Sequence, residues 1–386
     1  MSALLIGGGL AVVAYAYGGY PAAVILAARR QRPSATPPTP TEPPSITLII
    51  AAHNEEQVLE KKLVNSLELD YPDDRLEVIV AADGSDDGTV DLARRFADSG
   101  LTVLHRRERR GKSAALNRAV EVARHDIVVF SDANNHYEVD ALRRLVEPFA
   151  DPRVGVVTGA KEVVEGEGQV AGEGIYWRYE DAIKRAESDL GCCSAVTGEI
   201  TAIRRSLIEP IPTEIINDDF WLAMRGVCQG ARVVYAPEAR SIEPPSGDLV
   251  AERVRRTRMV AGRFQAMARW RQLVPLDQPR VAWQIVSHKF LRPLVPAAMF
   301  AVLVGTLLGL RRQPRRLPVV AAVGQAVFYG AAAAGRRPTG RRSVDLILTL
   351  PRFLVSSNWA AVEGFHAYIT GRATSVWTRV DRTPHD

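Results

Sequence analysis

Long runs without charge near both ends constrain this chain more than any other feature of its sequence. Four segments are free or nearly free of Asp, Glu, Lys and Arg: residues 3–28, 293–310, 317–335 and 346–371. Runs of roughly 18 or more uncharged residues are long enough to cross a bilayer as helices. Residues 45–290 are by contrast as charged as a soluble enzyme. The chain is therefore predicted to be a membrane protein with a soluble, catalytic-type insert.

The N-terminal run is either a membrane anchor or a signal peptide. It has no basic residue before its apolar core and is longer than a typical signal-peptide core, which favours an anchor. Arg29, Arg30 and Arg32 follow the run, and the positive-inside rule places such residues in the cytoplasm. We therefore expect a multi-pass protein of the plasma (inner) membrane, with its catalytic domain on the cytoplasmic side.

Composition excludes some partners. Cys192, Cys193 and Cys228 lack the spacing of metal ligands and are compatible with a reducing cytosol. The net charge of +5 is concentrated in residues 252–280 and the C-terminal loops, which predicts contact with a lipid bilayer and no nucleic-acid partner. The expected divisions are an N-terminal span (1–28), a proline-rich linker (29–44), an α/β domain (45–245), basic amphipathic interfacial helices (246–290), C-terminal spans (291–371) and a tail (372–386).

The first half of the insert alternates apolar strands with amphipathic helices. Such alternation implies a mainly parallel sheet covered by helices on both faces. A more irregular, mixed half follows at 154–245. The predicted strands are 45–52, 76–83, 101–105 and 126–132, and the predicted helices are 55–69, 86–100, 113–124 and 138–150.

Two polar loops follow neighbouring strands. "AAHNEE" (51–56) and "ADGSDDGT" (82–89) lie at the carboxyl edge of the predicted sheet, where such folds bind nucleotides. Asp83 is placed to accept hydrogen bonds from a base or ribose. The alternative is a turn and helix cap made by Ser85 and Asp87. The first strand is not followed by G-x-G-x-x-G, which disfavours a dinucleotide dehydrogenase.

A basic loop and a D-x-N sequence complete this edge. "RRGKSAALN" (109–117) brings Lys112 to a helix N-terminus and is a candidate diphosphate cradle, or simply a solvated basic turn. Asp132 and Asn134 follow the fourth strand, either as a polar turn or as ligands of one hard cation, Mg²⁺ or Mn²⁺. A bound metal would neutralise a leaving diphosphate. The order of these loops, each after a strand, favours the functional interpretation.

In this order the motifs resemble a known family. "LIIAAHNEE", "AADGSDDGT", "GKSAALN", "FSDANN", "VTGEITAIRR" and "NDDFWLAMR" are similar to the successive motifs of inverting family 2 glycosyltransferases. The layout is most similar to membrane-embedded cellulose, hyaluronan and poly-N-acetylglucosamine synthases, and the resemblance covers residues 45–290. It implies an α/β, GT-A fold: a Rossmann-like mixed sheet inserted between transmembrane helices.

The resemblance also implies residue roles. Asp219 would be the general base, with Asp218 beside it raising its pKa; the alternative is that both cap a helix. In the metal site an amide, Asn134, replaces the second carboxylate of the family's D-x-D. The acceptor side would be lined by Thr197, Gly198 and Glu199. The nucleotide sugar would contact Ala51, His53, Glu55, Asp83, Lys112, Asp132, Arg256 and Arg258.

Two details concern the C-terminal part. The processive synthases carry Q-R-x-R-W, whereas residues 255–259 read "RRTRM", so the tryptophan expected to stack on an acceptor sugar is Met259. Single transfer is therefore as well supported as polymerisation. Arg352 and Glu363 lie eleven residues apart, on one helix face, and are predicted to pair.

The predicted activity is transfer of a sugar from a nucleoside diphosphate sugar, most simply a UDP-sugar, to a membrane-presented glycan or a polyprenyl or other lipid acceptor. This is the chemistry of a hexosyltransferase in envelope or extracellular polysaccharide synthesis, working alone or with synthase or export subunits. One alternative is a non-catalytic subunit that only binds nucleotide sugar. A nucleotidyltransferase is another, although it gives no reason for the NDD segment or the spans.

Overall fold

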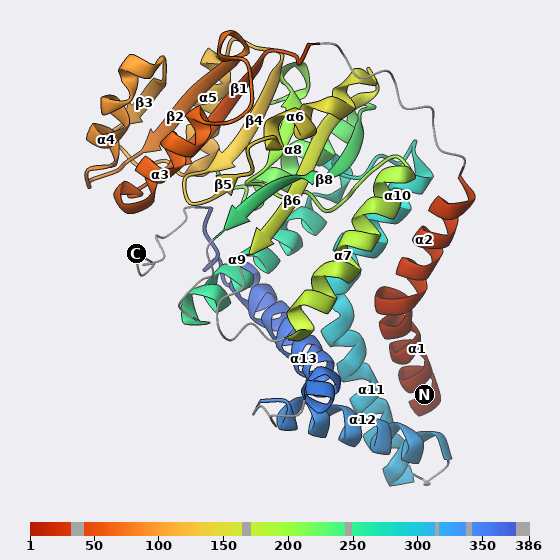
Figure 1. The fold of residues 1–386 in the computed structure, drawn as a ribbon. Helices are drawn as coiled ribbons and strands as arrows, with labels where there is room; N and C mark the ends of the chain where they lie inside the picture. Colours follow the sequence, from red (N-terminus) through yellow and green to blue (C-terminus); the bar gives the residue numbers. More distant parts are fainter. Residues whose placement is uncertain (32–41, 164–170, 244–248, 313–315, 337–341, 376–386) are drawn as a thin grey trace.

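The computed structural model describes residues 1–31, 42–163, 171–243, 249–312, 316–336 and 342–375 (Figure 1). Most of the predicted linker (29–44) and of the predicted tail (372–386) lies outside these residues. Residues 164–170, 244–248, 313–315 and 337–341 also lie outside them.

One eight-stranded mixed sheet forms the centre of the predicted α/β domain, and a mixed sheet was expected. Its strand order is β3-β2-β1-β4-β7-β6-β8-β5. The first four strands are parallel; β7 is antiparallel to both β4 and β6, and β5 is antiparallel to β8. The strands are β1 (Ile46–Ala52), β2 (Leu76–Asp83), β3 (Thr102–Arg106), β4 (Ile127–Asp132), β5 (His136–Tyr137), β6 (Val154–Val163), β7 (Thr201–Arg204) and β8 (Arg232–Glu243).

Alternating side chains of the strands bury both faces of this sheet. In β1, Ile49 and Ala51 join one core with α5 and α8, while Leu48 and Ile50 join the other with α3, α4 and α6. This is the two-residue period of a strand covered on both sides. The α-helices between the N-terminal helices and α10 are α3 (Glu56–Leu67), α4 (Thr89–Arg95), α5 (Lys112–Val122), α6 (Ala141–Val146), α7 (Ala171–Asp189), α8 (Asp218–Cys228) and α9 (Leu249–Ala268).

The register of the parallel strands brings their carboxyl ends together. Ala51 lies opposite Asp132 and Ala52 opposite Ala82. Strand β7 then runs antiparallel to β4, with Thr201 opposite Phe130. The loops after β1, β2 and β4 and the segment before β7 therefore converge at one edge.

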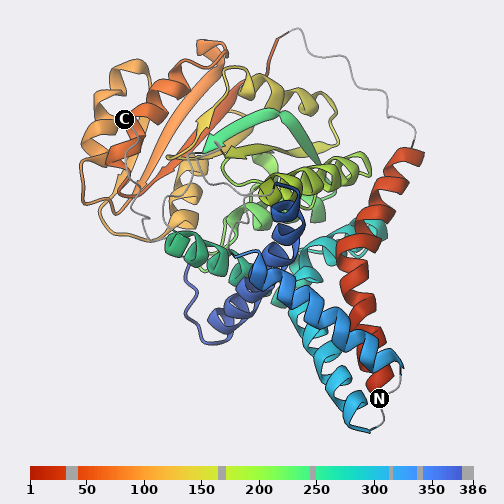
Figure 2. The ribbon, with the colours of Figure 1, turned by 60° about the horizontal axis from the view of Figure 1, so that its bottom comes forward.

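Apolar helices extend away from the sheet (Figures 1 and 2). Within the described residues, three are long and apolar enough to cross a membrane: Ser2–Arg30, Pro279–Arg312 and Arg316–Ala334. Two of them contain a π-helical turn, in which backbone hydrogen bonds join residues i and i+5 and interrupt the regular α-helical pattern. Their parts, with the last helix, are α1 (Ser2–Ala14), η1 (Tyr15–Gly19), α2 (Tyr20–Arg30), α10 (Pro279–Ile285), η7 (Val286–Phe290), η8 (Arg292–Leu294), α11 (Val295–Arg312), α12 (Arg316–Ala334) and α13 (Arg342–Ile369).

Helix α13 is not one of these three candidates, and its charges are placed differently from the prediction. Glu363 accepts hydrogen bonds from Arg253 of α9 and from the Trp359 indole. Arg352 donates to the carbonyl oxygen of Gly335 at 3.1 Å. The predicted Arg352–Glu363 pair is therefore wrong, because α9 packs against α13 and supplies a nearer cation. Figure 1 shows α7 and α9 between the sheet and the apolar helices.

Candidate active site

The loops after β1 and β2 are fastened to each other. The His53 ring Nδ1 lies 2.8 Å from the carbonyl oxygen of Asp83. Asn54, which adopts a left-handed backbone conformation, exchanges hydrogen bonds with Asp86 through its amide group. Glu55 caps α3 with its backbone, and its N–H donates to Thr89 Oγ1. These contacts hold the rim of the predicted nucleotide pocket in one shape.

Asp83 is the most constrained carboxylate of this rim. It is 1% exposed, and its Oδ2 accepts the N–H groups of Arg110 and Gly111 at 2.9 and 2.6 Å. Gly84 lies against Arg109, where an added Cβ would be 2.5 Å from the Arg109 Cβ. Asp83 Oδ1 has no hydrogen-bond partner among the described residues. A buried acceptor without a partner is costly, so this oxygen fits an N–H group of a bound base.

Lys112 links two carboxylates across the edge. Its Nζ lies 2.6 Å from Asp132 Oδ1 and 3.7 Å from Asp218 Oδ2. Burial alone lowers the pKa of Lys112, but Asp132, Asp218 and Asp219 outweigh burial and raise it. Burial likewise acts to raise the pKa of Asp132, yet the neighbouring ammonium groups, Lys112 first, hold it below its usual value. The site therefore contains a firmly charged ammonium group suited to a diphosphate.

Asp219 sits in the first turn of α8 and is the carboxylate most suited to act as a base. Burial and then the Asp218 carboxylate raise its pKa from 3.8 to about 6. The N-cap position of α8 belongs to Asn217, whose side chain makes no capping hydrogen bond. Gly198 packs against Asp219: a Cβ there would be 3.0 Å from the Asp219 Cβ. A pKa near 6 leaves the carboxylate ionised at neutral pH and still basic.

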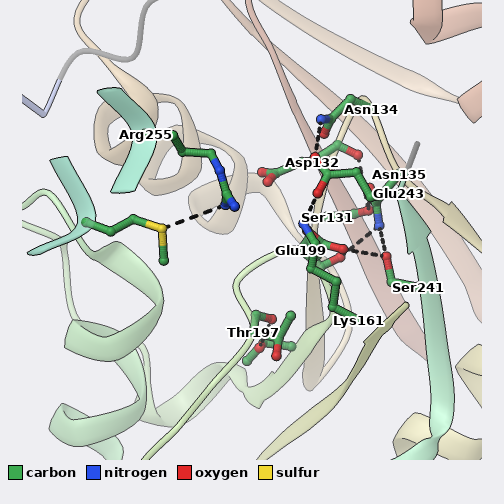
Figure 3. Close-up of polar contacts among 12 residues, drawn as sticks. Ser131, Asp132, Asn134, Asn135, Lys161, Thr197, Glu199, Ser241, Glu243 and Arg255 are labelled. Carbon is green, nitrogen blue, oxygen red and sulfur yellow. Dashed lines mark hydrogen bonds and ion pairs between the residues drawn. The ribbon is translucent and has the colours of Figure 1, made fainter. Parts of the chain in front are cut away.

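A second group of polar residues surrounds the D-x-N sequence (Figure 3). The Asn134 amide nitrogen donates to Glu243 at 2.9 Å. Lys161 lies between Glu243 and Glu199, 2.9 Å from Glu199 Oε2. The Glu199 carboxylate, which was predicted to line the acceptor side, is thus occupied by an ion pair with Lys161.

The donor set of the predicted metal site is small. Asp132 and Asn134 contribute one carboxylate and one amide carbonyl, and the described residues contain no group of three or more His, Cys, Asp or Glu arranged to hold a metal. Neither Asp132 Oδ2 nor Asn134 Oδ1 accepts a hydrogen bond in the described part of the chain. These two oxygens fit Mg²⁺ or Mn²⁺, provided that donor phosphates supply further ligands.

The remaining predicted residues lie in the segment before β7 and on helix α9. The Thr197 N–H donates to Thr158 Oγ1, and its hydroxyl accepts from Lys184 at 3.2 Å. Helix α9 carries Arg256 and Arg258, and its Met259 carbonyl accepts from the Asn217 amide at 3.0 Å. The segment in place of Q-R-x-R-W is therefore next to the NDD segment, and Figure 3 shows the neighbouring Arg255 pointing toward the D-x-N loop.

Two lysines near this edge, Lys161 and Lys62, were not among the predicted site residues. Lys161 lies in the apolar strand β6, where a lone lysine is itself a signal of an internal ion pair. Lys62 lies on the buried face of α3, and its Nζ is 4.0 Å from the centre of the Tyr137 ring. Burial lowers the pKa of Lys62 to about 7. The sequence feature that indicates a buried Lys62 is its position between Leu59 and Leu63 on the apolar face of the helix.

The chain is similar to known glycosyltransferases. Residues 47–211 match the family model described as glycosyl transferase family 2. The mannosyltransferase PcManGT from Pyrobaculum calidifontis, solved in complex with GDP-Man and Mn²⁺, is 27% identical with a TM-score of 0.70, covering 94% of this chain and 99% of that chain.

Two curated relatives match shorter segments. The probable glycosyltransferase YdaM of Bacillus subtilis is 28% identical over 211 residues, which are 49% of this chain and 48% of YdaM. The beta-monoglucosyldiacylglycerol synthase of Synechocystis is 37% identical over 117 residues, which are 29% of this chain and 24% of that protein. The chain thus spans less than half the length of either relative. Together the matches support a family 2 glycosyltransferase domain with a GT-A type sheet.

Proposed function

We propose that this protein is an inverting glycosyltransferase, of hexosyltransferase type, that moves a sugar from a nucleoside diphosphate sugar to an acceptor presented at a membrane. The observation that carries the proposal is the position of Asp219. A carboxylate with a pKa of about 6 lies beside Asp218, whose own oxygen is 3.7 Å from the Lys112 ammonium. A base and a diphosphate-binding cation thus share one edge of the sheet, as sugar transfer requires.

The donor is held from its base to its diphosphate along this edge. Asp83 Oδ1 accepts an N–H of the base, while Ala51, His53 and Glu55 shape the pocket. Lys112 binds the diphosphate. Arg256 and Arg258 approach it from α9. The solved relative that binds GDP-Man supports a nucleoside diphosphate sugar as donor.

In the reaction an acceptor hydroxyl attacks the anomeric carbon of the donor sugar. A new C–O bond forms on the face opposite the leaving group, and the bond to the diphosphate oxygen breaks with its electron pair. Asp219 takes the hydroxyl proton, so the products are the glycoside, the nucleoside diphosphate and a protonated carboxyl group. Lys112 stabilises the charge that develops on the diphosphate. The acceptor enters beside Thr197 and Gly198, the latter packed against Asp219.

Asp132 and Asn134 would hold a divalent cation, which, when bound, neutralises charge on the donor diphosphate. The Lys112 ammonium, 2.6 Å from Asp132, contributes to the same neutralisation. The PcManGT complex contains Mn²⁺, which supports a divalent metal as cofactor.

The acceptor is a glycan or lipid at the membrane surface. In the part of the chain that the structure describes, three apolar helices of spanning length flank the domain. The name of the Synechocystis relative indicates that it makes a glucosylated diacylglycerol. We assign the domain to the cytoplasmic side of the plasma membrane, where nucleotide sugars are available, and its product to envelope or extracellular glycans.

The test is transfer of radiolabelled sugar by the purified full chain in detergent, with a panel of UDP- and GDP-sugars and a membrane lipid extract. We expect one donor to label the lipid or glycan fraction with inverted anomeric configuration, and a chelator to lower the rate. Retained configuration would contradict the single-displacement mechanism. Pyrophosphate release would identify a nucleotidyltransferase, and donor binding without any turnover would identify a non-catalytic subunit.

A further inference from the structure

The residues between α7 and β7 include the predicted acceptor side, and side chains hold part of their backbone. We refer to residues 194–198 as the acceptor-side segment. The Ser194 N–H and hydroxyl both donate to Glu187 Oε2, at 2.8 and 2.9 Å. The Thr197 N–H donates to Thr158 Oγ1 at 2.8 Å. The position of the acceptor-side segment therefore depends on the side chains that accept these hydrogen bonds.

Glu187 of α7 connects this segment to the N-terminal apolar helix. Its second oxygen, Oε1, accepts a hydrogen bond from the Tyr20 hydroxyl in α2. Tyr20 also packs in an apolar cluster with Ile183 and Ala186 of α7. Glu187, Ser194 and Tyr20 are all 0% exposed, and a buried carboxylate is costly unless donors satisfy it. One carboxylate thus joins an apolar helix to the acceptor-side segment.

The residues after α10 fix the orientation of this carboxylate. His288 of η7 has its Nδ1 2.7 Å from Glu187 Oε1 and its Nε2 3.1 Å from Glu180 Oε2. Arg292 of η8 forms an ion pair with Glu180. Hydrogen bonds to charged groups in a buried network are strong and directional. The Glu187 carboxylate therefore has little freedom to move without its partners.

The acceptor-side segment ends beside the proposed base. Lys184 lies three residues before Glu187, on the same face of α7, and donates to the Thr197 hydroxyl at 3.2 Å. Gly198 follows, and a Cβ there would be 3.0 Å from the Asp219 Cβ. Because this contact is already close, a small shift of the segment changes the space beside the Asp219 carboxylate. Helix α7 thus acts on the surroundings of Asp219 through the acceptor-side segment.

We propose that Glu187 is a positioning residue for the acceptor, which fastens the acceptor-side segment to the N-terminal apolar helix. The inference rests on the proposed function and deepens it: a bilayer that orients the apolar helix also sets the geometry of the acceptor site. The donor side is held separately, since Asp83 accepts the backbone N–H groups of Arg110 and Gly111. Loss of the bridge should therefore slow transfer to the acceptor and spare donor binding, because small misplacements of reacting groups lower rates.

Two tyrosine variants test the bridge. Tyr20→Phe removes only the hydroxyl that donates to Glu187. Tyr179→Phe is the matched control: the Tyr179 hydroxyl also joins α7 to the N-terminal apolar helix, but it donates to a backbone carbonyl, that of Tyr17, at 2.8 Å.

We expect kcat/KM for the acceptor to fall about tenfold in Tyr20→Phe, the scale of one hydrogen bond to a charged group, and less than about twofold in Tyr179→Phe. Donor affinity in calorimetric titration should stay within about twofold of the original in both variants. Equal losses in the two variants would show general loosening between the helices and overturn the role of Glu187.

Hydrogen–deuterium exchange gives a second readout that needs no substrate. With the full chain in detergent, peptides that cover the acceptor-side segment should exchange at least about fivefold faster in Tyr20→Phe, because their N–H groups lose a fixed acceptor. The same is expected of Glu187→Met, which keeps a side chain of similar length but removes both oxygens. Tyr179→Phe should stay within about twofold of the original.

The exchange result separates the two claims. Unchanged exchange in Tyr20→Phe would overturn the bridge to the apolar helix, whatever the activity of the protein. Faster exchange in Tyr20→Phe, when the original protein transfers sugar from no donor, would refute the proposed function alone.

Discussion

The sharpest consequence of the site concerns pH. Burial and, after it, the Asp218 carboxylate raise the pKa of Asp219 from 3.8 to about 6. If Asp219 is the base, kcat/KM should fall about tenfold for each pH unit below 6 and level off above it. Asp218→Asn removes the neighbouring charge but leaves the burial. Because burial is the larger cause, we expect the acidic limb of the profile to move down by about 0.5 to 1 pH unit.

The assay is release of nucleoside diphosphate measured across acidic and neutral pH, at low donor concentration, for the original and variant proteins. Asp98→Asn is the matched control, because it removes an exposed carboxylate that is not among the predicted site residues and should leave the acidic limb in place. Asp218 also contacts Lys112, so the variant's plateau should be lower as well. An acidic limb that stays in place or moves upward in Asp218→Asn would refute the assignment of Asp219 as the titrating base.

Three further changes test the site and its support. Asp83→Asn should weaken nucleoside diphosphate binding about tenfold or more in calorimetric titration, because an amide cannot accept both backbone N–H groups and a base N–H as a carboxylate does. Unchanged affinity would exclude Asp83 from the donor site. Gly84→Ala should lower the free energy of unfolding by more than about 1 kcal/mol in a denaturant titration, because the φ angle of Gly84 is +65° and the alanine Cβ would collide with Arg109. An unchanged denaturation midpoint would contradict the close approach of Gly84 to Arg109. Lys62→Met should raise Tm at neutral pH, because burial of the ammonium group destabilises the fold. Burial lowers the Lys62 pKa from 10.5 to about 7, so the original protein gains stability only as the pH rises from about 7 toward 10.5. A lower Tm would show that the ammonium is stabilising.

The sequence predicted the parallel half of the fold well, because its signals are local. Buried strands in a parallel sheet are continuous apolar runs, and each ends at a polar loop. The predicted strand 76–83 agrees with β2, and the predicted strand 45–52 agrees with β1 to one residue. The edge shared by Asp83 and Asp132 follows directly from parallel pairing.

The acceptor side depends on contacts that no local pattern encodes. Glu199 meets Lys161 because β6 and β7 pair antiparallel, and Glu243 joins them because β6 also pairs with β8 in parallel. A shift in register between Gly159 and Ala160 sets which β6 side chains face that group. Glu199, which was predicted to line the acceptor side, therefore forms an ion pair with Lys161 because strands far apart in the sequence pair with each other. Similarly, Glu363 accepts a hydrogen bond from Arg253 of α9, which lies 110 residues earlier in the chain.

The measurement that tests the central claim most directly compares nucleoside diphosphate release by the original protein and by Asp219→Asn, in lipid, with the donor and acceptor identified by the transfer assay. Donor affinity is measured for both proteins in the same preparation. The account predicts that Asp219→Asn binds donor but releases nucleoside diphosphate at least about a hundredfold more slowly, the usual scale for loss of a general base. Release at the original rate by a variant that binds donor normally would contradict the role of Asp219 and the single-displacement mechanism built on it.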